Sequence, residues 1–127
     1  MHNPQLTKTF LADADVPPHR IVTGGSADDR VVPASATTQF LRGVSDAGLG
    51  LRPAGTSVDI HVSGVVEVEY GATVLLGDPL TADANGCAVP VALGAPNANP
   101  PVRFLGFSQE AGPAGVIGSL LIAPGLV

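Results

Sequence analysis

The segment from Val58 to Tyr70 constrains the fold more than any other part of the chain. Its even positions carry Val58, Ile60, Val62, Gly64, Val66, Val68 and Tyr70, and its odd positions carry Asp59, His61, Ser63, Val65, Glu67 and Glu69. Such period-2 alternation is typical of a strand with one face toward a core. Gly64 interrupts the apolar row, and a glycine there suits a bulge or a sharp bend. We therefore predict one long bent strand, or two strands that meet at Gly64.

The rest of the chain indicates more strands and almost no helix. Gly or Pro interrupts nearly every candidate helical window, and residues 35–41 offer at most one turn. We expect shorter strands at Leu6–Ala12, Arg20–Thr23, Arg30–Pro33, Phe40–Ser45, Gly86–Ala92, Val102–Gln109 and Val116–Ala123. Turn residues such as Asn85-Gly86 separate them. The spacing predicts an all-β, small single-domain antiparallel β-barrel or sandwich with little or no helix.

Length and composition predict one domain that has apolar surface available for binding other proteins. The chain has 127 residues, of which 45% are hydrophobic and only 13% charged, so we expect part of its apolar surface to be covered by other proteins. We divide it into an extended N-terminal arm, residues 1–12, and a β domain, residues 13–127. The arm is polar and contains Pro4, which suits strand addition to a neighbour, although an ordinary frayed terminus fits equally well.

Charge and hydropathy exclude two kinds of partner. The net charge is −5 with one Lys and five Arg, and no basic cluster is present, so nucleic-acid binding is not expected. Mean hydropathy is +0.34. The longest apolar stretches, such as Val116 to Ala123, are nevertheless far shorter than the ~20 residues of a membrane-spanning helix. The N-terminal sequence lacks the pattern of a secretory signal, which predicts synthesis in the cytoplasm and no membrane partner.

The titratable residues form no recognised catalytic or metal-binding pattern. The three histidines are far apart in the sequence, and His61 is expected to be solvated on the polar face of its strand. Glu67 and Glu69 lie on that face too and are interpreted as a solvent-facing pair. The single Cys87 is interpreted as a small buried hydrophobe.

The acidic residues near the N-terminus are the best remaining candidates for chemistry. They are Asp13, Asp15, Asp28 and Asp29. A small hydrolase with its site between subunits would need such carboxylates and a metal, but their spacing matches no established loop. The sequence therefore predicts no enzyme activity, no cofactor and no metal.

One ordered series of motifs goes beyond generic β sequence. It comprises Glu67–Val74 (EVEYGATV), Gly77–Gly86 (GDPLTADANG), Arg103–Glu110 (RFLGFSQE) and the closing Ile117–Gly125. In this order the motifs resemble the capsid decoration, or cement, proteins of tailed phages. The sequence departs from that pattern at Cys87 and in the Pro-rich loop Gly94–Pro101.

The resemblance implies a structural protein of the bacteriophage virion on the outer capsid surface. Such a protein bridges subunits of the major capsid protein as a homo-oligomer, with a trimer our first expectation and a dimer our second. We predict contacts with the capsid or between subunits from the arm, the Pro-rich loop and the final strand: Asn3, Pro4, Leu6, Lys8, Phe10, Asn97, Pro100, Pro101, Leu120 and Ile122. The final strand has a second interpretation, as an ordinary core strand. The alternative functions are a head fibre base, a receptor-binding knob and, least favoured, the inter-subunit hydrolase.

Overall fold

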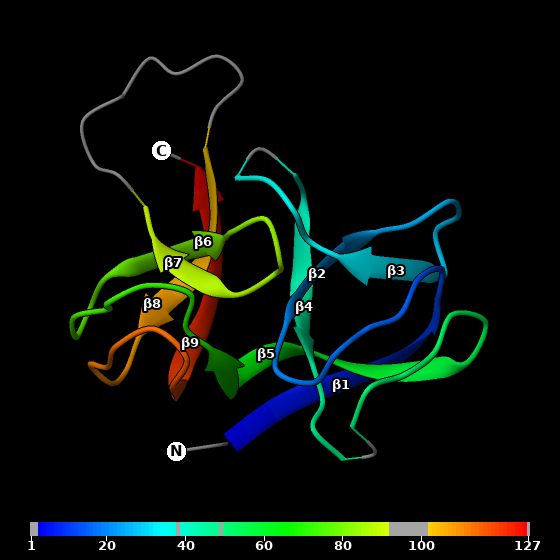
Figure 1. Ribbon diagram of the computed structural model, residues 1–127, viewed down its shortest axis with the longest axis horizontal. Coiled ribbons are helices and arrows are strands. Elements are labelled where there is room, and N and C mark those ends of the chain that lie inside the picture. The colour runs from blue at the N-terminus through cyan, green and yellow to red at the C-terminus, as the bar shows by residue number, and fades with distance from the viewer. Residues whose placement is uncertain (1–2, 38, 49, 92–101, 127) are drawn as a thin grey trace.

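In the part of the chain that the structure describes, nine strands join in one continuous sheet (Figure 1). The computed structural model describes residues 3–37, 39–48, 50–91 and 102–126. The strands are β1 Asn3–Ala12, β2 Ile21–Gly24, β3 Arg30–Pro33, β4 Leu41–Ser45, β5 Ser57–Glu69, β6 Pro79–Ala82, β7 Ala88–Pro90, β8 Arg103–Ser108 and β9 Ile117–Leu126. The predicted all-β class is confirmed. Within the described residues, no helix is long and apolar enough to cross a membrane.

The N-terminal half is a closed five-stranded barrel in the order β1-β3-β2-β4-β5, sealed by pairing of β1 with β5. One of its pairings is parallel, because Leu11 and Ala12 lie opposite Arg30 and Val31 in the same direction. Strand β2 does not pair with β1. The β2–β3 hairpin places β3 between them, so that β3 lies beside β1. This route makes the sheet mixed, whereas the sequence predicted a purely antiparallel one.

Strand β5 belongs to both halves and bends at Gly64. Its residues 57–65 pair with β1, and residues 65–69 pair with β9. Gly64 has a φ of +96°, and a Cβ atom there would lie 2.6 Å from both the Asn3 carbonyl oxygen and the Gln5 nitrogen. Only glycine fits this close approach without strain. The predicted long bent strand is therefore confirmed, and it lies along the lower edge of Figure 1 through both halves.

The C-terminal half continues the sheet from β5 in the order β9-β8-β6-β7. A parallel bridge between Tyr70 and Ala88 brings β7 back to the end of β5. Strand β6 was not predicted, because its sequence, Pro-Leu-Thr-Ala, follows a Gly-Asp turn and begins with a residue that cannot donate a ladder hydrogen bond. The side chain of Leu80 in this strand is fully buried.

Two apolar cores lie on the two faces of a shared wall made of β2 and β4. The N-terminal core contains Phe10, Ala12, Val16, Val22, Val31, Val58 and Ile60. The C-terminal core contains Ile21, Ala34, Leu41, Val44, Val66, Val68, Tyr70, Val74, Leu80, Ala82, Ala88, Leu105 and Leu120. Successive strand residues point to opposite faces, so Ile21 enters one core and Val22 the other. The two halves are therefore joined by packing as well as by β5.

Candidate interaction surfaces

Residues 3–12, predicted as an arm, form strand β1 on their own barrel. They pair with β5 from Asn3 to Leu11, and β3 covers the other backbone edge only at Leu11 and Ala12. The predicted contact residue Leu6 is 51% exposed, and Lys8 is exposed as well. Phe10 is buried, with the Arg42 guanidinium 4.6 Å and the Lys8 ammonium 5.9 Å from its ring centroid. Addition of this segment to a neighbour stays a prediction.

The predicted contacts of the final strand lie on its inner face. Leu120 is fully buried in the C-terminal core, and Ile122 packs against that core. Both side chains therefore pack inside this chain. Ile117 and Leu121, on the opposite face of the strand, point outward and are 38% and 40% exposed. The interpretation of this segment as a core strand is the correct one for Leu120. Asn97, Pro100 and Pro101 lie outside the described residues.

An uncharged row crosses the outer face of the C-terminal half. Val65 on β5 pairs with Leu121 on β9, Leu121 with Phe107 on β8, and Phe107 with Pro79 on β6. Paired residues on neighbouring strands place their side chains on the same face. Phe107 and Leu121 are 38% and 40% exposed, so the centre of this row is open to solvent. We call these four residues the apolar row.

Further apolar side chains lie close to β8, the strand that carries Phe107. The ring of Phe104 lies 5.4 Å from that of Phe107, centroid to centroid. Leu75 and Leu76, in the loop between β5 and β6, are 63% and 71% exposed. The Ser108 hydroxyl donates to the Leu75 carbonyl, which fixes this loop to the end of β8. Large apolar side chains gathered on one face are typical of protein–protein contact surfaces.

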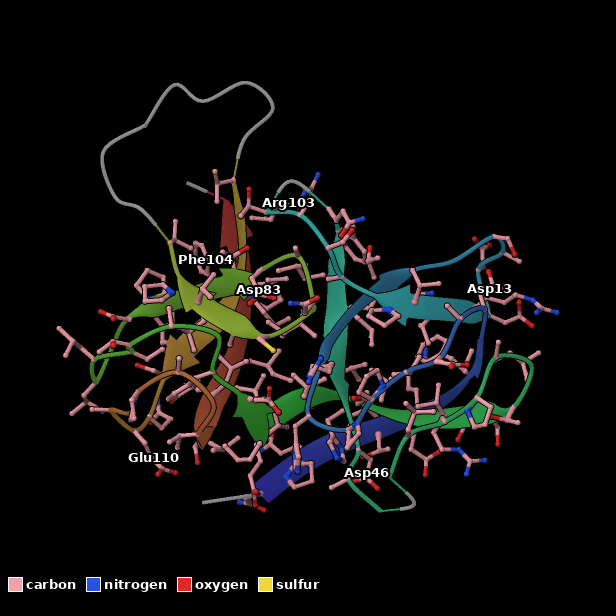
Figure 2. The ribbon with its side chains drawn as sticks, viewed as in Figure 1. Asp13, Asp46, Asp83, Arg103, Phe104 and Glu110 are labelled. Carbon is pink, nitrogen blue, oxygen red and sulfur yellow. The ribbon has the colours of Figure 1, made fainter. Side chains whose placement is uncertain are left out.

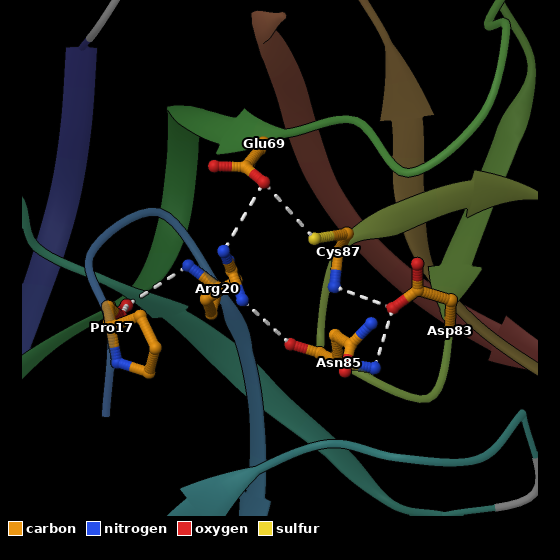
Figure 3. A network of polar contacts seen from close by, with 7 residues as sticks. Pro17, Arg20, Glu69, Asp83, Asn85 and Cys87 are labelled. Atoms are coloured by element: carbon orange, nitrogen blue, oxygen red, sulfur yellow. Dashed lines mark hydrogen bonds and ion pairs between the residues drawn. The ribbon is translucent and has the colours of Figure 1, made fainter. Parts of the chain in front are cut away.

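A polar network ties the β6–β7 hairpin to the N-terminal half (Figure 3). The Arg20 guanidinium contacts the Glu69 carboxylate at 3.2 Å and donates to the Asn85 carbonyl at 3.1 Å. The Asp83 carboxylate accepts the backbone N–H groups of Asn85 and Cys87 at 2.8 and 3.0 Å. Each of these bonds holds backbone or a neighbouring strand in place, so the network positions the hairpin.

Cys87 is buried, as predicted, and its thiol donates to Glu69. Burial raises the pKa of this thiol to about 11, and the nearby carboxylates of Asp83 and Glu69 add to the shift, while the Arg20 charge opposes it. A thiol with such a pKa is almost wholly protonated at neutral pH and is a poor nucleophile.

The prediction that His61 is solvated is wrong. The imidazole is only 5% exposed, and its two nitrogens bond the Thr7 hydroxyl at 2.9 Å and the Asp46 carboxylate at 3.0 Å. Strand β1 pairs directly with β5 at this point and places Thr7 beside the imidazole, and Asp46 approaches it from the turn after β4. Burial acts to raise the pKa of Asp46, but hydrogen bonds from His61 and the Gly48 N–H outweigh it and hold that pKa below its ordinary value.

The four aspartates considered for chemistry do not form a metal-binding group, and the carboxylates of two of them make structural contacts. Asp13 (Figure 2) accepts from the Ser26 N–H at 2.6 Å and pairs with Arg30 at 3.1 Å. The hydrogen bonds from Ser26 are the main cause that lowers the pKa of Asp13. Asp15 accepts the Ala54 N–H at 3.0 Å. Within the described ranges, no three or more His, Cys, Asp or Glu residues gather in a group that could hold a metal ion.

Comparison with known proteins finds a solved structure with a similar fold. No protein-family model and no curated protein sequence matches the chain. Among solved structures, the head fiber gp8.5 N base of bacteriophage phi29 is similar, with a TM-score of 0.70, 23% sequence identity and 93% of each chain covered. The chain therefore has a fold similar to that of a phage head fibre base over nearly its whole length.

Proposed function

We propose that this chain is a structural β-domain of a tailed-phage virion, which acts as a head fibre base on the outer surface of the capsid. The observation that carries the proposal is the match to the phi29 head fiber N base over 93% of both chains. A head fibre base is the first alternative to the cement role that the sequence leaves open. The match favours it over the cement role, in which the protein would clamp capsid subunits together.

The apolar row supports a role in protein binding. Phe107 and Leu121 lie side by side on adjacent strands, so one partner surface can bury both together. Burial of apolar area contributes roughly 25 cal/mol per Å², and interface energy is concentrated in a few large side chains of this kind. The partners we propose are the major capsid protein and further copies of this chain. A trimer remains our first expectation and a dimer the second. In either oligomer, several weak contacts acting together give high avidity.

The test is binding to phage heads that lack the protein. We expect saturable co-sedimentation and, by cryo-electron microscopy, density on the outer capsid surface that also shows the number of copies. Phe107→Asp and Leu121→Asp should each weaken binding, because a buried unpaired carboxylate costs several kcal/mol. Leu51→Asp is the matched control, since Leu51 is 50% exposed in the loop before β5 and lies outside the apolar row.

Head stability separates the two virion roles. A cement protein bridges capsid subunits, so its binding should raise the temperature at which heads open. A fibre base should occupy the heads with little change in that temperature. Absence of binding at concentrations well above micromolar would contradict both roles and leave the receptor-binding knob as the function to pursue.

A further inference from the structure

A second exposed aromatic feature lies where the two halves meet. A pocket of about 220 Å³ is lined by Phe40, Leu41, Arg103, Phe104, Pro124 and Gly125. Phe40 and Leu41 come from the start of β4, and the other four residues come from β8 and β9. Figure 2 labels Arg103 and Phe104 at the beginning of β8, beside the end of β9. The pocket therefore has one wall from each half of the molecule.

The size and walls of the pocket suit a side chain of another protein. Pockets for whole cofactors or drug-sized ligands occupy roughly 300–1,000 Å³, and this one is smaller. Phe40 is 64% exposed and is the most exposed phenylalanine among the described residues. The ring of Phe104 lies directly over Gly125, where a Cβ atom would be 2.5 Å from the ring, so this wall is closely packed.

Arg103 gives the pocket a charge preference. Its backbone N–H donates to the Thr37 carbonyl, but among the described residues its guanidinium has neither a hydrogen bond nor an ion pair. The chain as a whole carries a net charge of −5, whereas none of the six lining residues is acidic. A guanidinium beside aromatic rings binds carboxylates well, because its planar donors match the two carboxylate oxygens.

We propose that this pocket binds a segment of a partner protein in which a carboxylate lies next to an apolar side chain. The apolar side chain enters between Phe40 and Phe104, and the carboxylate contacts Arg103. Charge complementarity selects this occupant, because the pocket offers the Arg103 guanidinium and no acidic lining residue in a chain whose net charge is negative. The inference rests on the proposed function, since the partner is the protein of the virion to which the domain binds.

The chemistry can be tested without heads, by NMR titration of the isotope-labelled chain with N-acetyl-L-leucine and with its uncharged analogue N-acetyl-L-leucinamide. We expect the acid to shift the amide signals of Leu41, Phe104 and Gly125 and to bind about 10-fold more tightly than the amide, as a charged hydrogen bond contributes. Arg103→Gln should abolish this difference. Phe40→Ser should weaken both ligands.

Arg52→Gln is the matched control, because it removes the same charge from a residue outside the pocket, and it should bind both ligands as the wild type does. Circular dichroism and melting temperature confirm that each variant is folded. Equal binding of acid and amide to the wild type, or shifts located elsewhere, would overturn the proposal.

Binding to heads separates this inference from the proposed function. We expect Arg103→Gln to lower affinity for heads about 10-fold. If heads bind the wild type and Arg103→Gln equally, the pocket is not the docking site, and the proposed function stands. If heads do not bind the wild type, the proposed function fails, whereas the preference of the pocket for acid over amide is measured independently.

Discussion

The two halves of the molecule share β5 but present different outer surfaces. Before Gly64, the outward residues of β5 are Asp59, His61 and Ser63, of which Asp59 and His61 bond polar side chains of β1 and of the turn after β4. After Gly64, the outward row begins with Val65 and continues across β9, β8 and β6 as the apolar row. The inward row is apolar throughout. The two halves therefore differ in their outer faces and not in their cores. The outer face of β5 is polar in the N-terminal half, and the apolar row makes the C-terminal half suited to binding.

The shared wall of β2 and β4 predicts that the halves unfold together. Ile21 and Val22 are both fully buried, one in each core, so neither core can open without exposing one face of the wall. Small chains of this kind usually unfold in one cooperative step. Four substitutions test how far the two halves depend on each other.

The largest effect is expected from Leu105→Ala. Leu105 is fully buried in the C-terminal core, and its truncation leaves a cavity that should lower the free energy of unfolding by about 2–5 kcal/mol. Chemical denaturation should be followed by Tyr70 fluorescence, which reports on the C-terminal half of this Trp-free chain, and by far-ultraviolet circular dichroism, which reports on both halves.

If the wall couples the halves, the two signals of Leu105→Ala should change together at one lower midpoint. A fluorescence transition at lower denaturant than the dichroism transition would show that the C-terminal half opens alone. Leu51→Ala serves as the control, because this half-exposed loop residue should change stability by no more than about 0.5 kcal/mol.

Gly64→Ala tests the point where the two halves diverge. The positive φ and the contacts of the added Cβ with the backbone of β1 should cost about 1–3 kcal/mol. Hydrogen exchange should show the loss of protection concentrated at residues 3–6 and at 63–65. Gly55→Ala is a useful comparison, since Gly55 also has a positive φ but nothing lies within 4 Å of its Cβ position. Equal costs for both variants would mean that the close approach to β1 contributes nothing.

Much of this fold could be predicted from the sequence, because alternation and turn residues are local signals. The long strand with its bend at Gly64 and the burial of Cys87 follow from such signals, and both are confirmed. The parallel pairing of β1 with β3 was not predicted, since it depends on which strands meet in space. The same limit explains His61, which is buried by a strand more than fifty residues away in the chain.

The candidate surfaces show the same division between local and long-range information. The final strand was marked for contact, but which of its faces points outward depends on its register with β5 and β8, so Leu120 and Ile122 were chosen where Leu121 is the exposed residue. The apolar row joins residues of four strands, and the pocket joins β4 to β8 and β9. No sequence window contains either surface.

Tyr70→Phe should have a smaller effect within the C-terminal core. The buried hydroxyl donates to the Glu110 carbonyl at 2.7 Å, and its removal should cost about 0.5–1.5 kcal/mol. Burial, followed by the nearby Glu110 charge, raises the pKa of Tyr70, so the phenol should ionise above its ordinary range. Ultraviolet titration of the wild type measures this ionisation. A phenol that titrates near 10 in the folded protein would contradict the buried position of the ring.

The smallest effect is expected in the N-terminal half, from Asp46→Asn, and it depends on pH. The folded-state pKa of Asp46 is lowered from 3.8, so its contribution to stability is present above that pH and is lost as the pH falls through the folded-state value. The side chain is 36% exposed, so solvent screening keeps this contribution below about 1 kcal/mol. Melting temperatures measured from neutral pH into acid should therefore fall less steeply for Asp46→Asn than for the wild type. Asp28→Asn, which removes the same charge from an exposed turn, should follow the wild-type profile. Parallel profiles for Asp46→Asn and the wild type would mean that the Asp46–His61 contact does not stabilise the barrel.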